Sequence, residues 1–135
     1  MAVLGLGVDL VEVERFTREA TRQGADFATA FLLPAEIDRT SRDPHPDAAR
    51  AAHFAAKEAF WKALGSGLRG RLSWLDLEVV PGAGRQATLV LRGEAARLAA
   101  ARGIDRVALS TTRTRGHAAA LVVVAGGSRS AAPIE

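Results

Sequence analysis

The sequence predicts one α+β domain in which an antiparallel sheet packs against a long helix. Three observations support this prediction. Strong helix formers run from about Asp47 to Leu64 and stop at glycines, apolar runs typical of strands occur near both ends and in the middle of the chain, and turn residues separate these runs. With 135 residues, 48% of them hydrophobic, and no repeat or linker, the chain is sized for a single core.

The chain begins with an apolar strand that is expected to give way to a helix near Asp9. Residues Val3 to Val8 have the composition of a buried strand, and helical spacing takes over from there. Asp9 is therefore expected at a strand-to-helix junction. A carboxylate in that position acts either as a helix N-cap or as a ligand for a hard cation, and the position alone does not distinguish the two roles.

The first helix carries a basic stripe made of Arg15, Arg18 and Arg22, spaced at i, i+3 and i+7. The stripe lies roughly opposite the apolar face of the same helix, so it is expected to point outward. A charged helix face of this kind is often a solvated surface without any partner, and it also suits the docking of an acidic protein.

Short helices, strands and turns fill the rest of the chain. Pro34 suits the first turn of a helix, and the two prolines of residues 41–46 favour a loop. The expected elements are helices at 27–33, 34–40 and 94–102, a hairpin of strands 75–80 and 86–92 joined by residues 81–85, and a second strand pair at 106–112 and 117–124. Residues 126–135 are expected to form a disordered tail, which leaves 1–125 as the domain.

The long helix carries a distinctive charge pattern. Glu58 and Lys62 lie one turn apart on the same face, with Lys57 beside them. An ordinary surface pair of this spacing stabilises a helix by only about 0.2–0.5 kcal/mol and needs no function. A carboxylate between two lysines also suits a metal-bound phosphate, because Mg²⁺ takes one or two protein carboxylates and completes its shell with water and phosphate. Asp9 and Glu58 together would be a sufficient pair.

Two segments resemble the characteristic blocks of the holo-acyl-carrier-protein synthases, which are small 4'-phosphopantetheinyl transferases. The first block runs from Gly5 to Arg15, and the second from Phe54 to Gly67. The likeness extends from about residue 3 to residue 125, with weaker agreement at 75–79 and 118–124. Two blocks in the right order and at the right spacing are far more specific than either block alone.

This resemblance implies both the fold and the reaction. The fold is that of the short, trimeric type of 4'-phosphopantetheinyl transferase, whose active sites lie between neighbouring subunits. The reaction moves the 4'-phosphopantetheine group of coenzyme A to a serine of an apo acyl carrier protein and releases adenosine 3',5'-bisphosphate. Since such a transfer needs mainly positioning and charge neutralisation, Asp9 and Glu58 are expected to hold Mg²⁺, or Mn²⁺ in its place, against the pyrophosphate.

Lys62 is the third catalytic residue that the resemblance implies, close to the same phosphate oxygens. Whether it also accepts the proton of the serine is open, because a free lysine is protonated at neutral pH. Glu58, or a metal-bound water or hydroxide, would serve as an alternative. The sequence does not choose among these proton acceptors.

The coenzyme A contacts implied by the resemblance are His53, Lys57, Lys62, Gly65, Ser66, Arg85 and Arg113. Three of these positions depart from the usual family pattern. His53 replaces an arginine and carries less positive charge at neutral pH, so binding of the 3'-phosphate is expected to be weaker or more dependent on pH. An isolated histidine on a helix also has a structural role more often than a ligand-binding one. Arg113 stands where many relatives have a histidine; it either binds phosphate through its planar guanidinium or is simply solvated at the strand end. Arg85 followed by Gln86 replaces a frequent Lys-Pro pair.

The resemblance also assigns a partner to the basic stripe. Carrier proteins are typically acidic around the serine that they present, so Arg15, Arg18 and Arg22 become the expected docking surface for the acyl carrier protein. The sequence leaves open whether this carrier serves fatty-acid or polyketide synthesis.

The composition of the chain indicates where in the cell the protein is expected. The chain has no cysteine, no run of about 18 apolar residues and no secretory signal pattern. A cytoplasmic protein without membrane contact is therefore expected.

Two other functions fit parts of the sequence. A sequence pI near 10.5 and the arginine stripe suit a small nucleic-acid-binding module. However, the chain has only five Phe and two Trp, lacks Tyr, contains no RNA-binding consensus and has 15 acidic residues against 18 basic ones, so nucleic acid is not an expected partner. The changes at His53 and Arg113 would suit a degenerate protein that binds coenzyme A or a carrier without turnover. The presence of Asp9, Glu58 and Lys62 argues against this alternative, because a merely binding protein could lose them.

Overall fold

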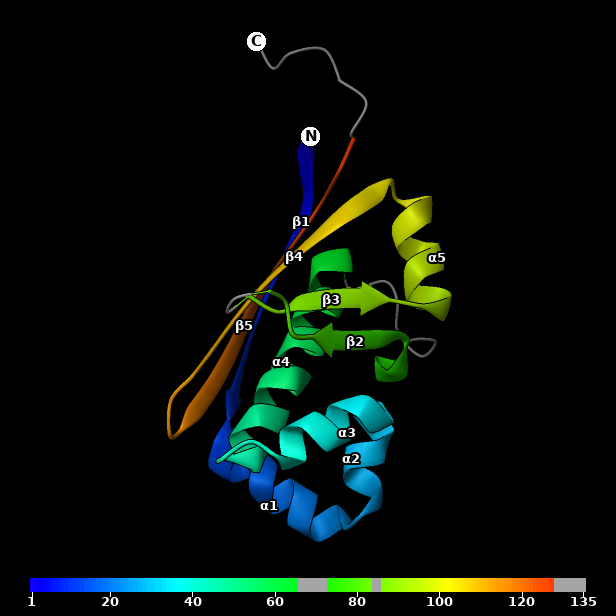
Figure 1. Ribbon diagram of the computed structural model, residues 1–135. Coiled ribbons are helices and arrows are strands. Elements are labelled where there is room, and N and C mark those ends of the chain that lie inside the picture. The colour runs from blue at the N-terminus through cyan, green and yellow to red at the C-terminus, as the bar shows by residue number, and fades with distance from the viewer. Residues whose placement is uncertain (66–72, 84–85, 128–135) are drawn as a thin grey trace.

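The computed structural model describes residues 1–65, 73–83 and 86–127. Within these residues a long helix, α4 (Pro46–Leu64), packs against a three-stranded antiparallel sheet with the order β1, β5, β4 (Figure 1). A separate antiparallel hairpin of β2 and β3 packs against α4 and β4. The strands are β1 Ala2–Glu12, β2 Leu77–Val80, β3 Thr88–Leu91, β4 Ile104–Arg113 and β5 His117–Gly126.

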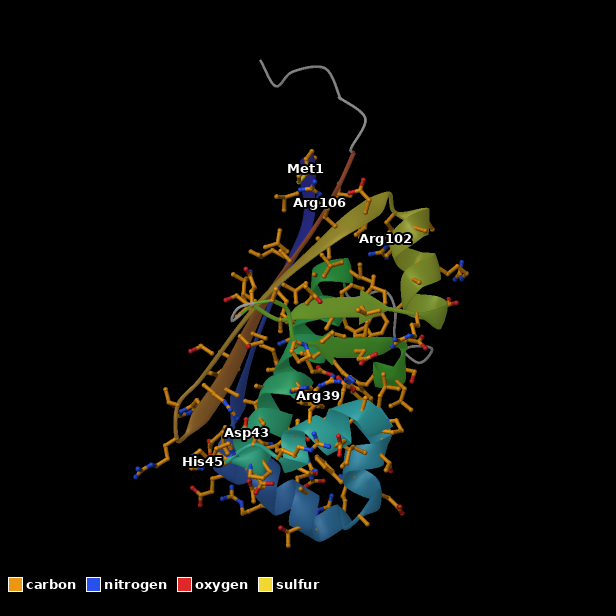
Figure 2. The ribbon with its side chains drawn as sticks, in the orientation of Figure 1. Met1, Arg39, Asp43, His45, Arg102 and Arg106 are labelled. Carbon is orange, nitrogen blue, oxygen red and sulfur yellow. The ribbon has the colours of Figure 1, made fainter. Side chains whose placement is uncertain are left out.

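The main core forms around α4, whose alanine-rich sequence lets neighbouring elements approach it closely. Phe60 is fully buried at its centre, together with Leu77 of the hairpin and Val122 and Val124 of β5. Helix α5 (Gly93–Ala101) covers one end of this core. Just beyond α5 lies Arg102, which is labelled in Figure 2. Its side chain donates a hydrogen bond to the backbone carbonyl of Leu64, where α4 ends.

Two glycines set how β1 meets α4. A Cβ atom at Gly7 would lie 1.8 Å from the backbone oxygen of Ala59, and one at Gly5 would lie 2.1 Å from that of Ala63. Any side chain there would push the strand off the helix. Because side chains alternate along a strand, Asp9 follows on the same side of β1 and is directed at α4.

A second cluster surrounds the first half of α4. Three helices contribute to it: α1 (Val13–Gln23), α2 (Asp26–Phe31) and α3 (Pro34–Ser41). Its centre is a set of rings with centroids 5.2–6.0 Å apart, formed by Phe16, Phe27, Phe31, Phe54 and Trp74. Most of these pairs meet edge to face, the geometry that the ring quadrupoles favour.

The predicted fold class is confirmed, and so are the long helix and both strand pairs. The position of Asp9 is a correction. Strand β1 continues to Glu12, and α1 begins only at Val13, without a side-chain hydrogen bond from its N-cap. Pairing with β5 explains the extra length, since the register runs without interruption from Gly5 opposite Val124 to Glu12 opposite His117.

Smaller differences occur at element ends. Helix α2 stops at Phe31, and a short 3-10 helix, η1 (Trp74–Asp76), precedes β2 where the strand was expected to have begun. Strand β5 extends to Gly126, while residues 128–135 lie outside the described part, so the division at 125 stays a prediction.

The face of the sheet turned away from α4 is apolar and exposed. Its largest members are Leu6, Val8 and Leu10 of β1 and Leu121 of β5, with exposed fractions between 39% and 67%. Val8 and Leu121 are direct cross-strand partners. Exposed apolar patches are typical of surfaces that contact other molecules. Among the described residues, no helix has the length and apolar character needed to cross a membrane.

Candidate active site

Asp9 meets Lys62 on the side of β1 that faces α4. Its Oδ1 accepts a hydrogen bond from Nζ of Lys62 at 2.8 Å, and the same ammonium donates to the backbone carbonyl of Val8 at 3.2 Å. The Asp9 side chain is only 13% exposed, whereas that of Lys62 is 54% exposed. A largely buried acid therefore holds a cation that remains open to a ligand from solvent.

Glu58 lies on α4 one turn before Lys62, so it occupies the same side of the helix. Its Oε1 accepts a hydrogen bond from the indole Nε1 of Trp74 at 2.9 Å. Lys62 thus connects the two acids: it is paired with Asp9 in space and is adjacent to Glu58 along the helix.

Each of the two acids offers the kind of oxygen ligand that a hard divalent cation takes. Each has one oxygen engaged within the protein, while no hydrogen bond in the described part of the chain reaches Oδ2 of Asp9 or Oε2 of Glu58. In the same residues, no three Asp, Glu, His or Cys side chains gather into a closed metal site. Two carboxylates with available oxygens match Mg²⁺, which keeps several waters and binds substrate phosphate.

The environment of Lys57 contradicts the expectation that this residue contacts coenzyme A. The side chain is 0% exposed, and its Nζ donates to the backbone carbonyl of Phe31 at 2.6 Å and to Oε1 of Glu36 at 2.7 Å. Glu36 is equally buried and accepts two backbone N–H groups, from Leu33 and Val79. Burial lowers the pKa of Lys57, while Glu36 opposes this effect. Lys57 of α4 therefore has a structural role: it bonds directly to α2 and α3, and through Glu36 it is connected to β2.

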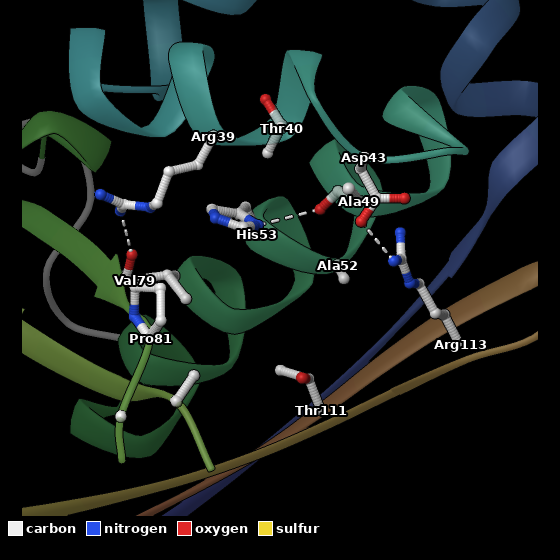
Figure 3. Close-up of a pocket in the computed structure, with 12 residues that line it drawn as sticks. Arg39, Thr40, Asp43, Ala49, Ala52, His53, Val79, Pro81, Thr111 and Arg113 are labelled. Carbon is white, nitrogen blue, oxygen red and sulfur yellow. Dashed lines mark hydrogen bonds and ion pairs between the residues drawn. The ribbon is translucent and has the colours of Figure 1, made fainter. Parts of the chain in front are cut away.

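A pocket of about 280 Å³ opens between α3, α4, the β2–β3 hairpin and β4 (Figure 3). Its charged and polar lining consists of Arg39, Thr40, Asp43, His53, Thr111 and Arg113. Arg39 donates to the backbone carbonyl of Val79 at 2.7 Å, and Arg113 donates to Oδ2 of Asp43 at 2.6 Å. Guanidinium groups that approach from two sides suit an anionic ligand such as a phosphate ester.

His53 lies between the two arginines of this pocket (Figure 3). Its Nδ1 lies 2.9 Å from the backbone carbonyl of Ala49, and burial lowers the pKa of the imidazole below its ordinary value. Burial raises the pKa of Asp43, but hydrogen bonds from Arg113 and from the backbone N–H of His45 outweigh it and leave this pKa lowered. The pocket therefore holds a neutral imidazole and an ionised Asp43 near neutral pH.

The pocket and the acid pair lie on opposite faces of α4. His53 and Lys62 are nine positions apart, and at about 100° per residue this equals two and a half helical turns. The pocket borders β4, at one edge of the sheet, whereas Asp9 belongs to β1 at the other edge. The pocket and the acid pair therefore face different sides of α4.

The basic stripe is exposed, as its spacing predicted. Arg18 pairs with Glu14, and Arg22 pairs with Glu19, so part of the positive charge is compensated within α1. Arg15 makes no ion pair inside the described part of the chain. The stripe is therefore less basic than its three arginines alone suggest.

The remaining predicted contacts divide into two groups. Gly65 ends α4 with a positive φ of 96°, and its backbone N–H bonds to the carbonyl of Lys62. Ser66 and Arg85 lie outside the described residues. Sequence reasoning missed Arg39 and Trp74, which reach the site from elements distant along the chain, and neither carried a local signal.

Comparison with known proteins adds a family to this geometry. Residues 5–122 match the 4'-phosphopantetheinyl transferase superfamily. The chain is 41% identical over 128 residues to a holo-[acyl-carrier-protein] synthase of Desulforudis audaxviator, which covers 95% of this chain and 97% of the relative.

Solved structures agree in fold as well. The crystal structure of holo-[acyl-carrier-protein] synthase from Neisseria meningitidis matches with a TM-score of 0.83 at 32% identity, covering 92% of this chain and 99% of that one. The enzyme from Helicobacter pylori in complex with coenzyme A matches with a TM-score of 0.76 at 28% identity, covering 89% and 99%. The similarity thus spans nearly the whole of each protein.

Proposed function

Because the chain belongs to the 4'-phosphopantetheinyl transferase superfamily, we propose that it acts as a holo-acyl-carrier-protein synthase in which Asp9 and Glu58 bind the essential divalent ion. The enzyme transfers the 4'-phosphopantetheine group of coenzyme A to a serine hydroxyl of an apo acyl carrier protein. Adenosine 3',5'-bisphosphate is the other product. The observation that carries the assignment of the site is the Asp9–Lys62 ion pair beside Glu58, in a chain that synthases match over nine-tenths of its length.

The donor set supports Mg²⁺, or Mn²⁺ in its place, as the ion held by Asp9 and Glu58. When bound, such an ion offsets negative charge on the pyrophosphate that is cleaved. The protein's own share of this task belongs to Lys62, whose exposed ammonium supplies a positive charge next to the acids. Its pairing with Asp9 supports a role for Lys62 in charge neutralisation and orientation.

The pocket lined by Arg39, His53 and Arg113 suits the phosphorylated adenosine end of coenzyme A. Its volume of about 280 Å³ lies near the lower end of ligand pockets, so it accommodates one end of this long cofactor and not the whole. In this chain the two arginines supply the charge for the 3'-phosphate, because His53 is neutral near pH 7.

The opposite placement of pocket and acid pair supports a homotrimer with active sites between subunits. Coenzyme A held through the divalent ion at Asp9 and Glu58 of one subunit would then reach Arg113 of the next. The apolar outer face of the sheet, with Leu6, Leu10 and Leu121 exposed, gives such an assembly a surface to bury. Basic Arg15, Arg18 and Arg22 on α1 remain the proposed docking surface for the acidic carrier, in the cytoplasm.

Subunit mixing tests the shared site. Glu58→Gln and Arg113→Ala would each give an inactive homotrimer by damaging different halves of the site. When the two variants are unfolded together and refolded, some mixed trimers contain an interface with both halves intact, so activity should return. Failure to recover any activity, with trimers present by light scattering, would contradict the shared site.

The activity itself is tested by mass spectrometry of the carrier. After incubation with coenzyme A and Mg²⁺, an apo acyl carrier protein should gain one phosphopantetheine group per serine modified. Glu58→Gln should abolish this gain without unfolding the protein. Binding of the carrier or coenzyme A without any gain in mass would instead identify a non-catalytic binding protein.

A further inference from the structure

We propose that Trp74 is a positioning residue for Glu58: its indole N–H fixes one carboxylate oxygen and so turns the other toward the divalent ion. The inference rests on the proposed role of Glu58 as a metal ligand. The 2.9 Å bond from Nε1 to Oε1 joins side chains sixteen residues apart, so it depends on the fold and not on local chain geometry.

Trp74 is itself held in place, which gives its N–H a defined direction. It begins η1, and Ser73 caps this turn by accepting a hydrogen bond from the backbone N–H of Leu75 at 3.1 Å. The indole ring packs on Phe54, with centroids 6.0 Å apart and an interplanar angle of 32°. Since Phe54 lies one turn before Glu58 on α4, the same helix supports both the ring and its acceptor.

The chemistry of the bond explains its effect on the carboxylate. An indole N–H only donates, so one oxygen of Glu58 must stay an acceptor directed at Trp74, and the side chain loses its freedom to rotate. The second oxygen is then fixed as well. Asp9 has equivalent support from Lys62, so each acid of the pair keeps one oxygen engaged within the protein.

Trp61, the other tryptophan in the chain, provides a matched control. It lies on α4 three residues after Glu58, and its ring packs against Phe60 with centroids 5.1 Å apart. Its buried Nε1 has no hydrogen-bond partner among the described residues. Trp61→Phe thus removes an indole near the same site without removing a bond to a carboxylate.

Binding of Mn²⁺ tests the proposal without any turnover. Electron paramagnetic resonance of free Mn²⁺ is followed during titration of the protein with coenzyme A present and the carrier absent. Partners of metal ligands typically change metal affinity about 10- to 100-fold, so Trp74→Phe should weaken binding by about 10-fold or more. Trp61→Phe should bind Mn²⁺ as the wild type does, and thermal unfolding reports whether each variant is folded.

A second measurement leaves Trp74 in place. In the Trp61→Phe protein, Trp74 is the only tryptophan. Bound Mn²⁺ should quench the fluorescence of Trp74, and the quenching should saturate at the same Mn²⁺ concentrations as the binding measured by electron paramagnetic resonance. Adding Glu58→Gln to this protein should remove the saturable quenching.

The outcomes separate this inference from the function it rests on. Wild-type Mn²⁺ affinity in folded Trp74→Phe, or equal weakening by both tryptophan variants, would overturn the positioning role and leave the metal role of Glu58 standing. If Trp74→Phe does not fold, the Trp61→Phe protein decides instead. Binding of Mn²⁺ to that protein without quenching of Trp74 emission would also overturn the positioning role. Unchanged Mn²⁺ binding in Glu58→Gln would overturn both.

Discussion

Two lysines five positions apart on α4 have opposite environments. Lys57 is fully buried and bonded to Glu36 and to a backbone carbonyl, whereas Lys62 is 54% exposed and bonded to the carboxylate of Asp9. Both make an ion pair, with N–O distances of 2.7 and 2.8 Å. The distances are nearly equal, so burial alone decides that the first pair is structural and the second is available for chemistry.

The energetic meaning of the two pairs differs for the same reason. Removing one partner of a buried pair leaves an uncompensated charge in a medium of low dielectric, which is strongly destabilising. In the second pair the ammonium of Lys62 is half exposed, so water screens the charge and the pair contributes less to stability. Mutations at the two sites should therefore affect different properties of the protein.

The largest expected effect is the loss of stability in Lys57→Met. Breaking a buried ion pair costs about 3–5 kcal/mol, and Glu36 keeps only its two backbone donors in this variant. Urea unfolding measures the change. A double variant, Lys57→Met with Glu36→Gln, should recover part of the loss because the buried charge is removed. A loss below about 1 kcal/mol in the single variant would remove the distinction between the two lysines.

Lys62→Ala should show the complementary behaviour. Losing one charge that faces the reacting phosphates costs about 100-fold or more in kcat, while urea unfolding should change little. Lys62→Arg separates two roles: neutralisation of charge predicts substantial recovery, and a role as proton acceptor predicts none. Assays of transfer to the carrier at saturating coenzyme A give the result.

Charge reversal in the basic stripe of α1, the helix that packs on the first half of α4, tests the proposed docking surface. The double variant Arg15→Glu with Arg18→Glu should raise the KM for the carrier by about 10-fold, because the attraction between the basic stripe and the acidic carrier, which speeds their encounter, is replaced by repulsion. The KM for coenzyme A should stay nearly unchanged. Raising ionic strength should reduce this difference. Equal changes in both KM values would contradict a docking role for the stripe.

The smallest effect is expected at His53, one turn before Lys57. Because burial lowers the pKa of His53 in the folded state, the unfolded chain binds a proton that the folded chain does not as pH falls through about 6.5. Stability is then lost as pH falls below 6.5, by no more than about 1.4 kcal/mol per pH unit. Unfolding at pH 7.0 and 5.5 should show this loss in the wild type and a smaller one in His53→Gln. An equal slope in both proteins would mean that His53 is accessible to protons in the fold.

Local signals account for what the sequence predicted well. Helix formers ending at glycine gave α4, and paired apolar runs around short turns gave both hairpins. The position of Asp9 could not be read in this way, because β1 owes its length to pairing with β5, more than a hundred residues away. Helical spacing put Lys57 and Lys62 beside Glu58 equally well. Only the packing of α3 and β2 on α4 buried the first of them.

In the candidate site, too, local sequence patterns predicted some residues, and long-range packing placed the others. Asp9, Glu58 and Lys62 followed from two recognisable blocks of sequence, since each block keeps its residues close together along the chain. Trp74 and Arg39 act through bonds to residues 16 and 40 positions away, to which no spacing rule applies.

In the proposed active site, Asp9 and Glu58 share one divalent ion. Crystals grown with Mn²⁺ and coenzyme A test it directly, through the anomalous scattering of the metal. We expect one anomalous peak in contact with both carboxylates and with the pyrophosphate. A peak that touches neither acid, or only one of them in every subunit, would contradict it.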